Sequence, residues 1–278
     1  MSRAIAALFA IVSTALFGQL AEFEAASVRP HAAGVPGTYP PTGGVGTNDP
    51  ERIVYNGFTL GALLLPAFGV NHSYRILGPD WLNGDQDRYD VAAIIPAGAT
   101  KEQFSLMLQR LLVERFQIAS HWEKKEVSGY GLLVGKNGPK MKASGSKENG
   151  IGGPQEGTAK SECSKLHVGK SPDVQVSASP KGVCFVAVQQ PMSRLADFLD
   201  GTLTRPVADR TGLTGLYDFA LFYSVEGTFM DRTLRPDSEG APYVVTAVQE
   251  QLGLKLEPQK ARIDVLVVDR VNKKPTEN

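Results

Sequence analysis

The sequence predicts an α+β fold built from two fused β-α-β-β-α-β-β repeats, with helices packed on a mainly antiparallel sheet. Helical segments with one apolar stripe alternate along the chain with strand-like segments of period two. A short pattern also recurs. Tyr89-Asp90-Val91 resembles Tyr217-Asp218-Phe219, and each follows a glycine-containing turn. The recurrence indicates a duplicated chain. Amphipathic helices beside alternating strands favour a layered arrangement with the helices on one face of the sheet.

The composition is that of an ordinary globular protein. A chain of 278 residues with 42% apolar residues can bury a sizeable core in one large or two ordinary domains. Lys plus Arg equals Asp plus Glu at 29 each, so no net charge favours nucleic acid or an anionic membrane surface. We therefore expect no nucleic-acid partner.

Residues 1–21 are predicted to be a secretory signal peptide, which makes the mature chain secreted or periplasmic. Arg3 precedes an uncharged apolar run at 4–18, followed by small and polar residues where cleavage could fall. The alternatives are a buried helix or a membrane anchor, but the run is shorter than the about 20 residues that a span needs. No stable membrane span is expected after cleavage.

Export makes the only two cysteines, Cys163 and Cys184, candidates for a disulfide. An oxidising compartment permits such a bridge, and closing this loop is worth about 3 kcal/mol in the chain-entropy picture. The alternative is a pair of free thiols. Two cysteines cannot form a tetrahedral zinc site, and the four histidines show no ligand spacing, so no metal or cofactor is expected.

The first repeat is predicted at 22–134, opening with a strand at 22–30. A long surface loop rich in Gly, Pro and Thr follows at 31–50; it is either a connector or part of a binding site. Further on, Thr59 can cap a short helix that Pro66 should kink or end early.

The rest of the first repeat contains a predicted hairpin at 75–93 and the clearest helix of the chain. Trp81 lies in the hairpin turn and is interpreted as a core residue, with ligand stacking as the alternative. Thr100 and Gln103 form a capping box at the start of the helix. Two strands are expected after that helix, separated by a charged bend at 123–126.

The remaining chain is divided into an irregular linker, a second repeat and a tail, at 135–182, 183–271 and 272–278. Glycine, lysine, serine and proline dominate the linker, which shows no periodicity. In the second repeat we expect a strand at 185–188, helices at 192–203 and 244–252, a hairpin at 205–221, and strands at 254–256 and 263–268.

The candidate site residues are polar or aromatic and lie near turns. Trp81, Arg205 and Asp209 are the predicted binding residues; alternatively Arg205 pairs with Asp209 or Asp218 and fixes the hairpin register. A carboxylate pair could perform glycosidic chemistry, whereas the structural interpretation is that such aspartates accept backbone N–H bonds. The aspartates considered are Asp80, Asp90, Asp209 and Asp218.

No sequence motif specifies a reaction. The chain has no GxSxG elbow, P-loop or dinucleotide fingerprint. Gly43-Gly44-Val45-Gly46 is glycine-rich but follows no strand-to-helix pattern, so it is interpreted as unrelated to nucleotide binding.

Several ordered motifs together resemble a paralogous family of exported soil-acidobacterial proteins of the Solibacter type, whose function is unknown. Related domains form the extracytoplasmic C-terminal part of membrane proteins similar to beta-lactam-sensor metallopeptidases. This chain lacks the HExxH zinc motif, so the resemblance implies sensing or binding and transfers no catalytic residues. The motifs are FEAASVRP from Phe23, GPDWL from Gly78, LLVERF from Leu111, RPVADRTGLTGLYDF from Arg205, EQLGLKLE from Glu250 and VLVVD from Val265.

We therefore expect an exported, non-catalytic binding or interaction module whose partner is an envelope or extracellular protein or a small ligand. The alternative is an extracytoplasmic hydrolase with carboxylates at the interface of the repeats. A structural envelope protein that self-associates through edge strands is a third hypothesis. A binding module should expose an apolar or edge-strand surface, whereas an enzyme should show a pocket where two or more of the aspartates converge.

Overall fold

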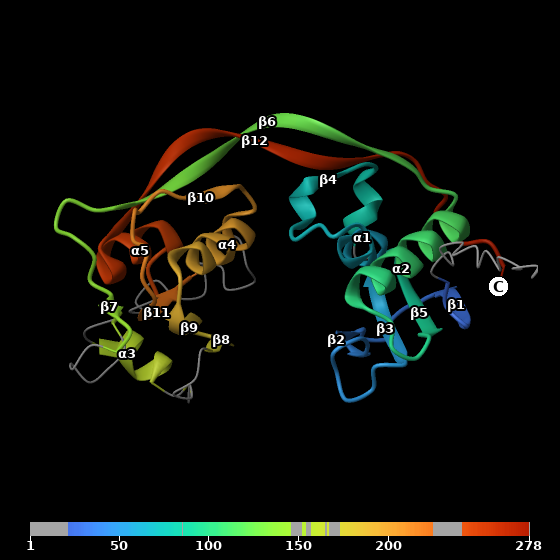
Figure 1. Ribbon diagram of the computed structural model, residues 1–278, viewed down its shortest axis with the longest axis horizontal. Coiled ribbons are helices and arrows are strands. Elements are labelled where there is room, and N and C mark those ends of the chain that lie inside the picture. The colour runs from blue at the N-terminus through green and yellow to red at the C-terminus, as the bar shows by residue number, and fades with distance from the viewer. Residues whose placement is uncertain are drawn as a thin grey trace, which may run out of the picture. The chain divides into compact units, whose positions relative to one another are not determined.

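The computed structural model has a mixed α+β fold, which confirms the predicted class (Figure 1). The predicted signal peptide at 1–21 and most of the loop that follows Ser224 lie outside the described residues. The structure describes residues 22–84, 86–145, 152–153, 157–164, 166, 173–224 and 241–277.

The chain divides into two compact units that are not simple halves of the sequence. The first unit consists of the described parts of Met1–Asn71, Gly78–Ser120 and Val268–Asn278. The second consists of His72–Leu77 and the described parts of His121–Val267. The short segment His72–Leu77 therefore belongs to the second unit, although its neighbours in sequence on both sides belong to the first.

The first unit is built on a four-stranded antiparallel sheet in the order β1-β5-β3-β2. Apolar residues alternate along its central strands, and Ile53, Tyr55, Val91 and Ala93 are all buried. One of the strands, β2, lies within the stretch 31–50 that was predicted to be a loop. The strands are β1 Ala25–Pro30, β2 Thr38–Gly43, β3 Arg52–Thr59 and β5 Arg88–Ile94.

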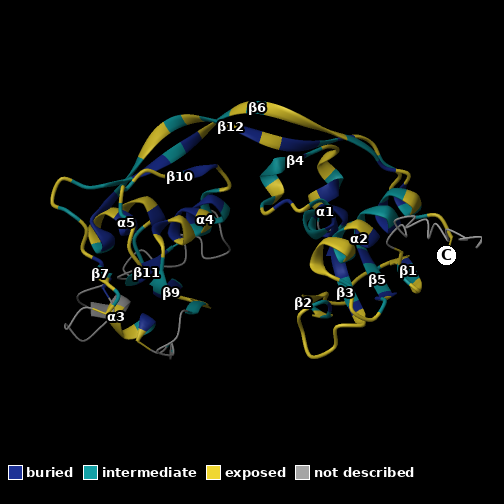
Figure 2. Cartoon of the chain, viewed as in Figure 1, coloured by how far each residue is buried: buried dark blue, intermediate teal, exposed yellow. Residues whose placement is uncertain are grey.

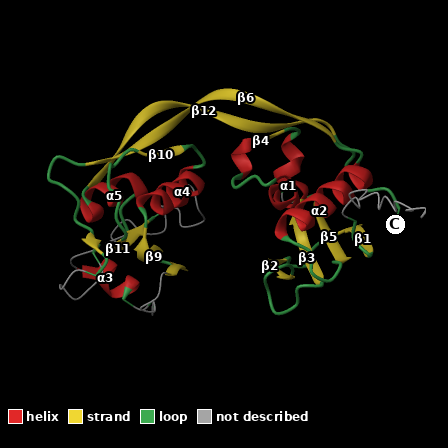
Figure 3. Cartoon of the chain, in the orientation of Figure 1, coloured by secondary structure: helices red, strands yellow, loops and turns green. Residues whose placement is uncertain are grey.

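Two helices, α1 Leu60–Phe68 and α2 Lys101–Phe116, complete the first unit and lie against its sheet (Figure 3). Thr59 caps α1 by accepting a hydrogen bond from Ala62, as predicted. Pro66 does not end this helix, which continues to Phe68 and stops at Gly69, where φ is 64°. The capping box of Thr100 and Gln103 is confirmed at the start of α2.

The second unit contains a sheet in the order β7-β11-β9-β8 and three helices. The helices predicted at 192–203 and 244–252 are confirmed as α4 and α5. Three elements, β7, α3 and β8, lie entirely within 135–182, the stretch that was predicted to be irregular. The elements are β7 Lys142–Ala143, α3 Gly157–Cys163, β8 Asp173–Ser179, β9 Gly182–Gln190, α4 Met192–Leu203, β11 Tyr217–Tyr223 and α5 Val244–Leu252.

The central strands of this sheet, β9 and β11, are buried on both faces (Figure 2). Phe185 and Phe219 face the core that includes α4 and α5, whereas Cys184, Val186 and Phe222 face a second cluster beside α3. Successive side chains of a strand point to opposite faces, so a strand covered on both sides reads as a continuous apolar run. The confirmed disulfide from Cys163 to Cys184 joins α3 to this second face.

A third sheet has the order β10-β6-β12-β4, with the short strands at its edges. β4 pairs in parallel with β12, and β10 pairs in parallel with β6. The hairpins predicted at 75–93 and 205–221 are therefore wrong, because the two strands of each belong to different sheets. These elements are η1 Ser73–Arg75, β4 Ile76–Leu77, η2 Asp80–Asn83, β6 Ala119–Val134, β10 Val207–Asp209 and β12 Leu254–Arg270.

The two long strands also correct the prediction of a charged bend at 123–126. Lys124 contacts Asp264 at 2.7 Å and Lys260 contacts Glu126 at 3.9 Å, so the pairs run in opposite orders, as in an antiparallel pairing. Cross-strand pairs of opposite charge suit a strand that is exposed to water. Each predicted repeat consequently ends in one long strand rather than two short ones, in the order β-α-β-β-α-β.

The two predicted repeats share one local feature, a β-bulge whose backbone N–H donates to an aspartate. In β3 the bulge residue Gly57 has a φ of 72°, and its N–H donates to Asp90 Oδ1 at 2.9 Å. In β9 the corresponding residue is Gln189, with a φ of 53°, and its N–H donates to Asp218 Oδ1 at 2.8 Å. A helix begins shortly after each bulge. The hydrogen bonds at both bulges match the structural interpretation of Asp90 and Asp218.

The two bulges should respond in opposite ways to substitution. Gly57→Ala places a Cβ 2.6 Å from Gly37 Cα at a left-handed φ, so we expect a loss of at least about 1 kcal/mol in unfolding free energy. Gln189→Gly relieves the left-handed strain and should leave stability unchanged or raise it by up to about 1 kcal/mol. Urea unfolding of both variants measures the difference, and an equal loss in both would contradict the assignment.

The disulfide should stabilise the second unit. Cys163→Ser combined with Cys184→Ser opens a loop of sequence separation 21, so we expect a loss of about 3 kcal/mol in unfolding free energy. Denaturant unfolding of the double variant measures the loss, and reduced wild-type protein serves as a control that should show a similar change. No difference between oxidised and reduced wild type would contradict this role.

Candidate functional site

The four aspartates considered from the sequence each have local surroundings of their own. Asp209 Oδ1 accepts bonds from the N–H and the hydroxyl of Thr211, at 3.0 and 2.7 Å. Asp218 also accepts from the Ser144 hydroxyl at 2.6 Å, and Asp90 is 2.6 Å from His31 Nδ1. Asp80 is exposed in η2. These local contacts order turns and bulges.

The other two predicted binding residues, Trp81 and Arg205, lie in different units. Trp81 is half-buried in η2, with the Lys273 ammonium 5.8 Å from the centre of its ring, whereas its neighbour Leu82 is the buried residue of that turn. Arg205 is exposed and uses its backbone N–H to donate to Asp200 O. Within the described chain its side chain makes no ion pair with Asp209 or Asp218, and Asp218 lies in β11, which belongs to a different sheet from β10.

Asp200, a residue of α4 that the sequence did not single out, is the only buried charged residue among those described, at 6% exposure. Its Oδ1 accepts from the Tyr74 hydroxyl at 2.7 Å and lies 3.1 Å from His72 Nε2. Its Oδ2 accepts from Val207 N at 3.3 Å and lies 3.6 Å from an Arg75 guanidinium nitrogen. All of these residues belong to the second unit. Both carboxylate oxygens are therefore satisfied.

The Asp200 cluster is best explained as a structural network. Burial, with a further contribution from the hydrogen bond to Asp200, raises the pKa of Tyr74 to about 12, so this phenol stays a proton donor at neutral pH. The rings of His72 and Tyr74 stack at 5.9 Å. A buried carboxylate surrounded by donors anchors the segment that carries them, here the segment leading into β4.

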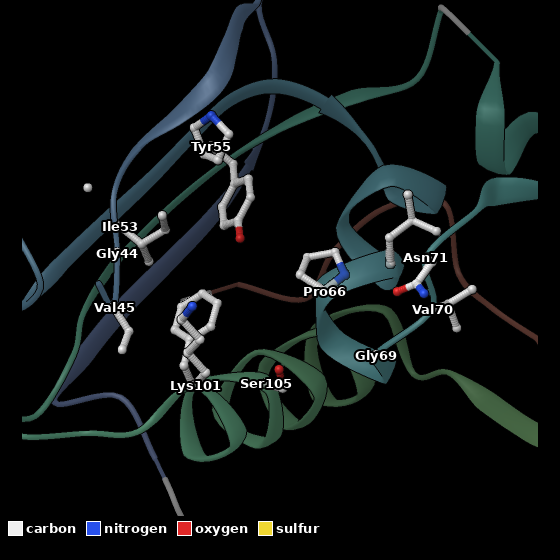
Figure 4. A pocket seen from close by; sticks show the side chains of 14 residues that line it. Gly44, Val45, Ile53, Tyr55, Pro66, Gly69, Val70, Asn71, Lys101 and Ser105 are labelled. Atoms are coloured by element: carbon white, nitrogen blue, oxygen red, sulfur yellow. The ribbon is translucent and has the colours of Figure 1, made fainter. Parts of the chain in front are cut away.

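A pocket of about 390 Å³ lies within the first unit (Figure 4). The lining comes from the end of β2 with the residues up to Val45, from the end of α1 with the residues that follow it, and from the first turns of α2. Ile53 and Tyr55 of β3 also line the pocket. The apolar side chains among the lining residues are Pro41, Val45, Ile53, Leu65, Pro66, Val70 and Phe104.

Two of the glycines dismissed in the sequence, Gly43 and Gly44, line this pocket. Gly43 has a φ of 78°, and a Cβ at this position would lie 2.2 Å from the carbonyl oxygen of Arg52. Only glycine suits that backbone at such a close approach. The glycines thus shape one wall of the pocket, without any nucleotide motif.

Few polar groups reach the pocket, and Tyr55 is the most buried of them at 4% exposure. Its hydroxyl points into the space between Lys101 and Pro66 (Figure 4). Within the described chain this hydroxyl makes no hydrogen bond, and burial raises the pKa of Tyr55 to about 12. Asn71 and Ser105 add an amide and a hydroxyl to the lining.

The sequence predictions missed this pocket, because its residues come from separated segments that share no motif. Tyr55 resembled any inward-facing strand residue, and Lys101 resembled any exposed helix residue. The glycine run and the capping box at Thr100 were the available signals, and they indicated backbone geometry rather than a cavity.

The described residues hold no group of three or more His, Cys, Asp or Glu side chains that could bind a metal ion. The helices described here include none with the length and apolar character needed to cross a membrane. The pocket of the first unit combines an apolar lining with polar groups of Tyr55, Lys101, Asn71 and Ser105.

Comparison with known proteins assigns the chain to a family. The model of a family described as Protein of unknown function (DUF3738) matches residues 61–271. Because this match covers more than half of the sequence, the chain belongs to that family. No curated protein and no solved structure matches the chain.

The Asp200 cluster yields a stability prediction. Asp200→Ala should lower the unfolding free energy by about 2–3 kcal/mol, because buried donors on Tyr74 and Val207 lose their acceptor. Asp209→Ala is the matched control: its carboxylate is exposed, and we expect a loss below about 1 kcal/mol. Denaturant unfolding compares the two, and equal losses would show that the cluster has no special role.

Proposed function

We propose that the protein is an exported, non-catalytic binding module and that the pocket of the first unit is its ligand site. The observation that carries this proposal is the pocket itself. Its volume of about 390 Å³ lies in the range of small-molecule sites, and its mainly apolar lining carries a few polar groups, as such sites do.

The residues around the pocket favour binding over hydrolysis. A carboxylate-based hydrolase needs two acidic groups at one reaction centre, but the described lining contains neither Asp nor Glu. Of the aspartates considered for that chemistry, Asp90, Asp209 and Asp218 accept bonds from nearby groups elsewhere, and Asp80 lies outside the lining. The Asp200 carboxylate is likewise occupied by its own network.

Export is supported by two independent features. The disulfide from Cys163 to Cys184 suits an oxidising compartment such as the periplasm or the exterior. The ordered motifs, from FEAASVRP to VLVVD, resemble exported proteins of the Solibacter type and the extracytoplasmic parts of sensor-like membrane proteins. A secreted or periplasmic module that senses or carries a small ligand fits both.

Filling the pocket should abolish binding of an apolar probe. We expect the uncharged fluorescent dye N-phenyl-1-naphthylamine to bind the wild type, and Ser105→Phe to weaken it at least about tenfold, since the new ring occupies the cavity. Dye fluorescence at increasing protein concentration gives both affinities.

The adjacent residue on α2 provides the matched control. Leu106 is 56% exposed and lies outside the pocket lining, so Leu106→Phe should bind the dye as the wild type does. Failure of the wild type to bind the dye, or equal binding by all three proteins, would refute the proposed ligand site.

A further inference from the structure

The charge on the described lining of the pocket is positive only. Lys101 is the only charged residue among the described residues that line it. No ion pair holds this ammonium within the described chain, and its side chain extends toward the space that the Tyr55 hydroxyl enters (Figure 4). Glu102 follows in sequence but lies outside the lining, and its own N–H and Thr100 lower the pKa of that carboxyl group.

Tyr55 supplies a hydrogen-bond donor beside this cation. Desolvation disfavours the phenolate, and the resulting pKa of about 12 keeps the hydroxyl protonated at neutral pH. The Tyr55 hydroxyl faces the pocket, and the described residues offer it no hydrogen-bond partner. A ligand that displaces water from the pocket without accepting this hydrogen bond would leave the hydroxyl unpaired, at a cost in free energy. An acceptor on a bound ligand would supply that partner.

The start of α2 adds to the same positive field. Lys101, Phe104 and Ser105 of its first two turns line the pocket, and the N-terminus of a helix carries a partial positive charge. A lysine at that end is disfavoured by the helix dipole, so an anion bound nearby would relieve the repulsion. The remaining lining is apolar and offers a surface for a hydrocarbon body.

We propose that the pocket binds a small amphiphile carrying one carboxylate on an apolar body, an inference that rests on the proposed function. The carboxylate accepts a hydrogen bond from Tyr55 and pairs with Lys101, while the apolar body packs against Ile53, Leu65 and Phe104. A neutral molecule of the same shape makes only the contacts with the apolar lining.

Two probes of matched shape test the inference, namely naphthalene-2-carboxylate and naphthalene-2-carboxamide, titrated calorimetrically into the full chain. We expect the carboxylate to bind about tenfold or more tightly than the carboxamide, because hydrogen bonds to charged groups are the stronger ones. Lys101→Met should remove most of that preference, and Tyr55→Phe should reduce it severalfold. Added salt should reduce the preference of the wild type for the carboxylate over the carboxamide.

Two controls distinguish the loss of the pocket charge from a loss of folding. Lys274→Met removes an exposed cation of the first unit that lies outside the pocket, and it should leave the preference unchanged. Circular dichroism establishes that each variant is folded. If both probes bind equally, or if Lys101→Met keeps the preference, the inference is overturned while the ligand site stands. If neither probe nor the uncharged dye binds, both proposals fail.

Discussion

The first unit depends on how the Asp90 carboxylate holds the bulge of β3. Asp90 accepts from the Gly57 N–H at 2.9 Å, and an Arg88 nitrogen donates to the Gly57 carbonyl at 2.7 Å, so β5 satisfies both peptide groups of the bulge. β3 therefore turns at Gly57 and leads directly into the Thr59 cap of α1. Tyr55 of β3 and the end of α1 consequently line the same pocket.

The second unit contains the same kind of bulge, but its sheet is covered differently. Asp218 holds Gln189, after which α4 begins, but this sheet is also covered on its other face by α3 and the disulfide. The strand that carries Cys184 is consequently buried on both sides. A unit closed on both faces suits a stable scaffold, whereas the first unit provides the pocket.

Local signals in the sequence predicted local structure well. The capping box at Thr100 and the apolar stripes of α4 and α5 are encoded within a few turns of helix, and their bounds matched the prediction closely. Strand pairing was not predictable in this way, because β4 and β10 find partners far along the chain. The charged run at 123–126 lacks apolar residues and resembled a bend, yet cross-strand ion pairs accompany it in β6. The pocket, assembled from separated segments, left no pattern.

Amide chemical shifts of the labelled protein test whether ligands bind in the first unit. During titration with naphthalene-2-carboxylate, the perturbed amides should cluster in three lining segments, at 43–45, 69–71 and 101–105. Shifts confined to the second unit, or spread evenly over both units without saturation, would contradict the account.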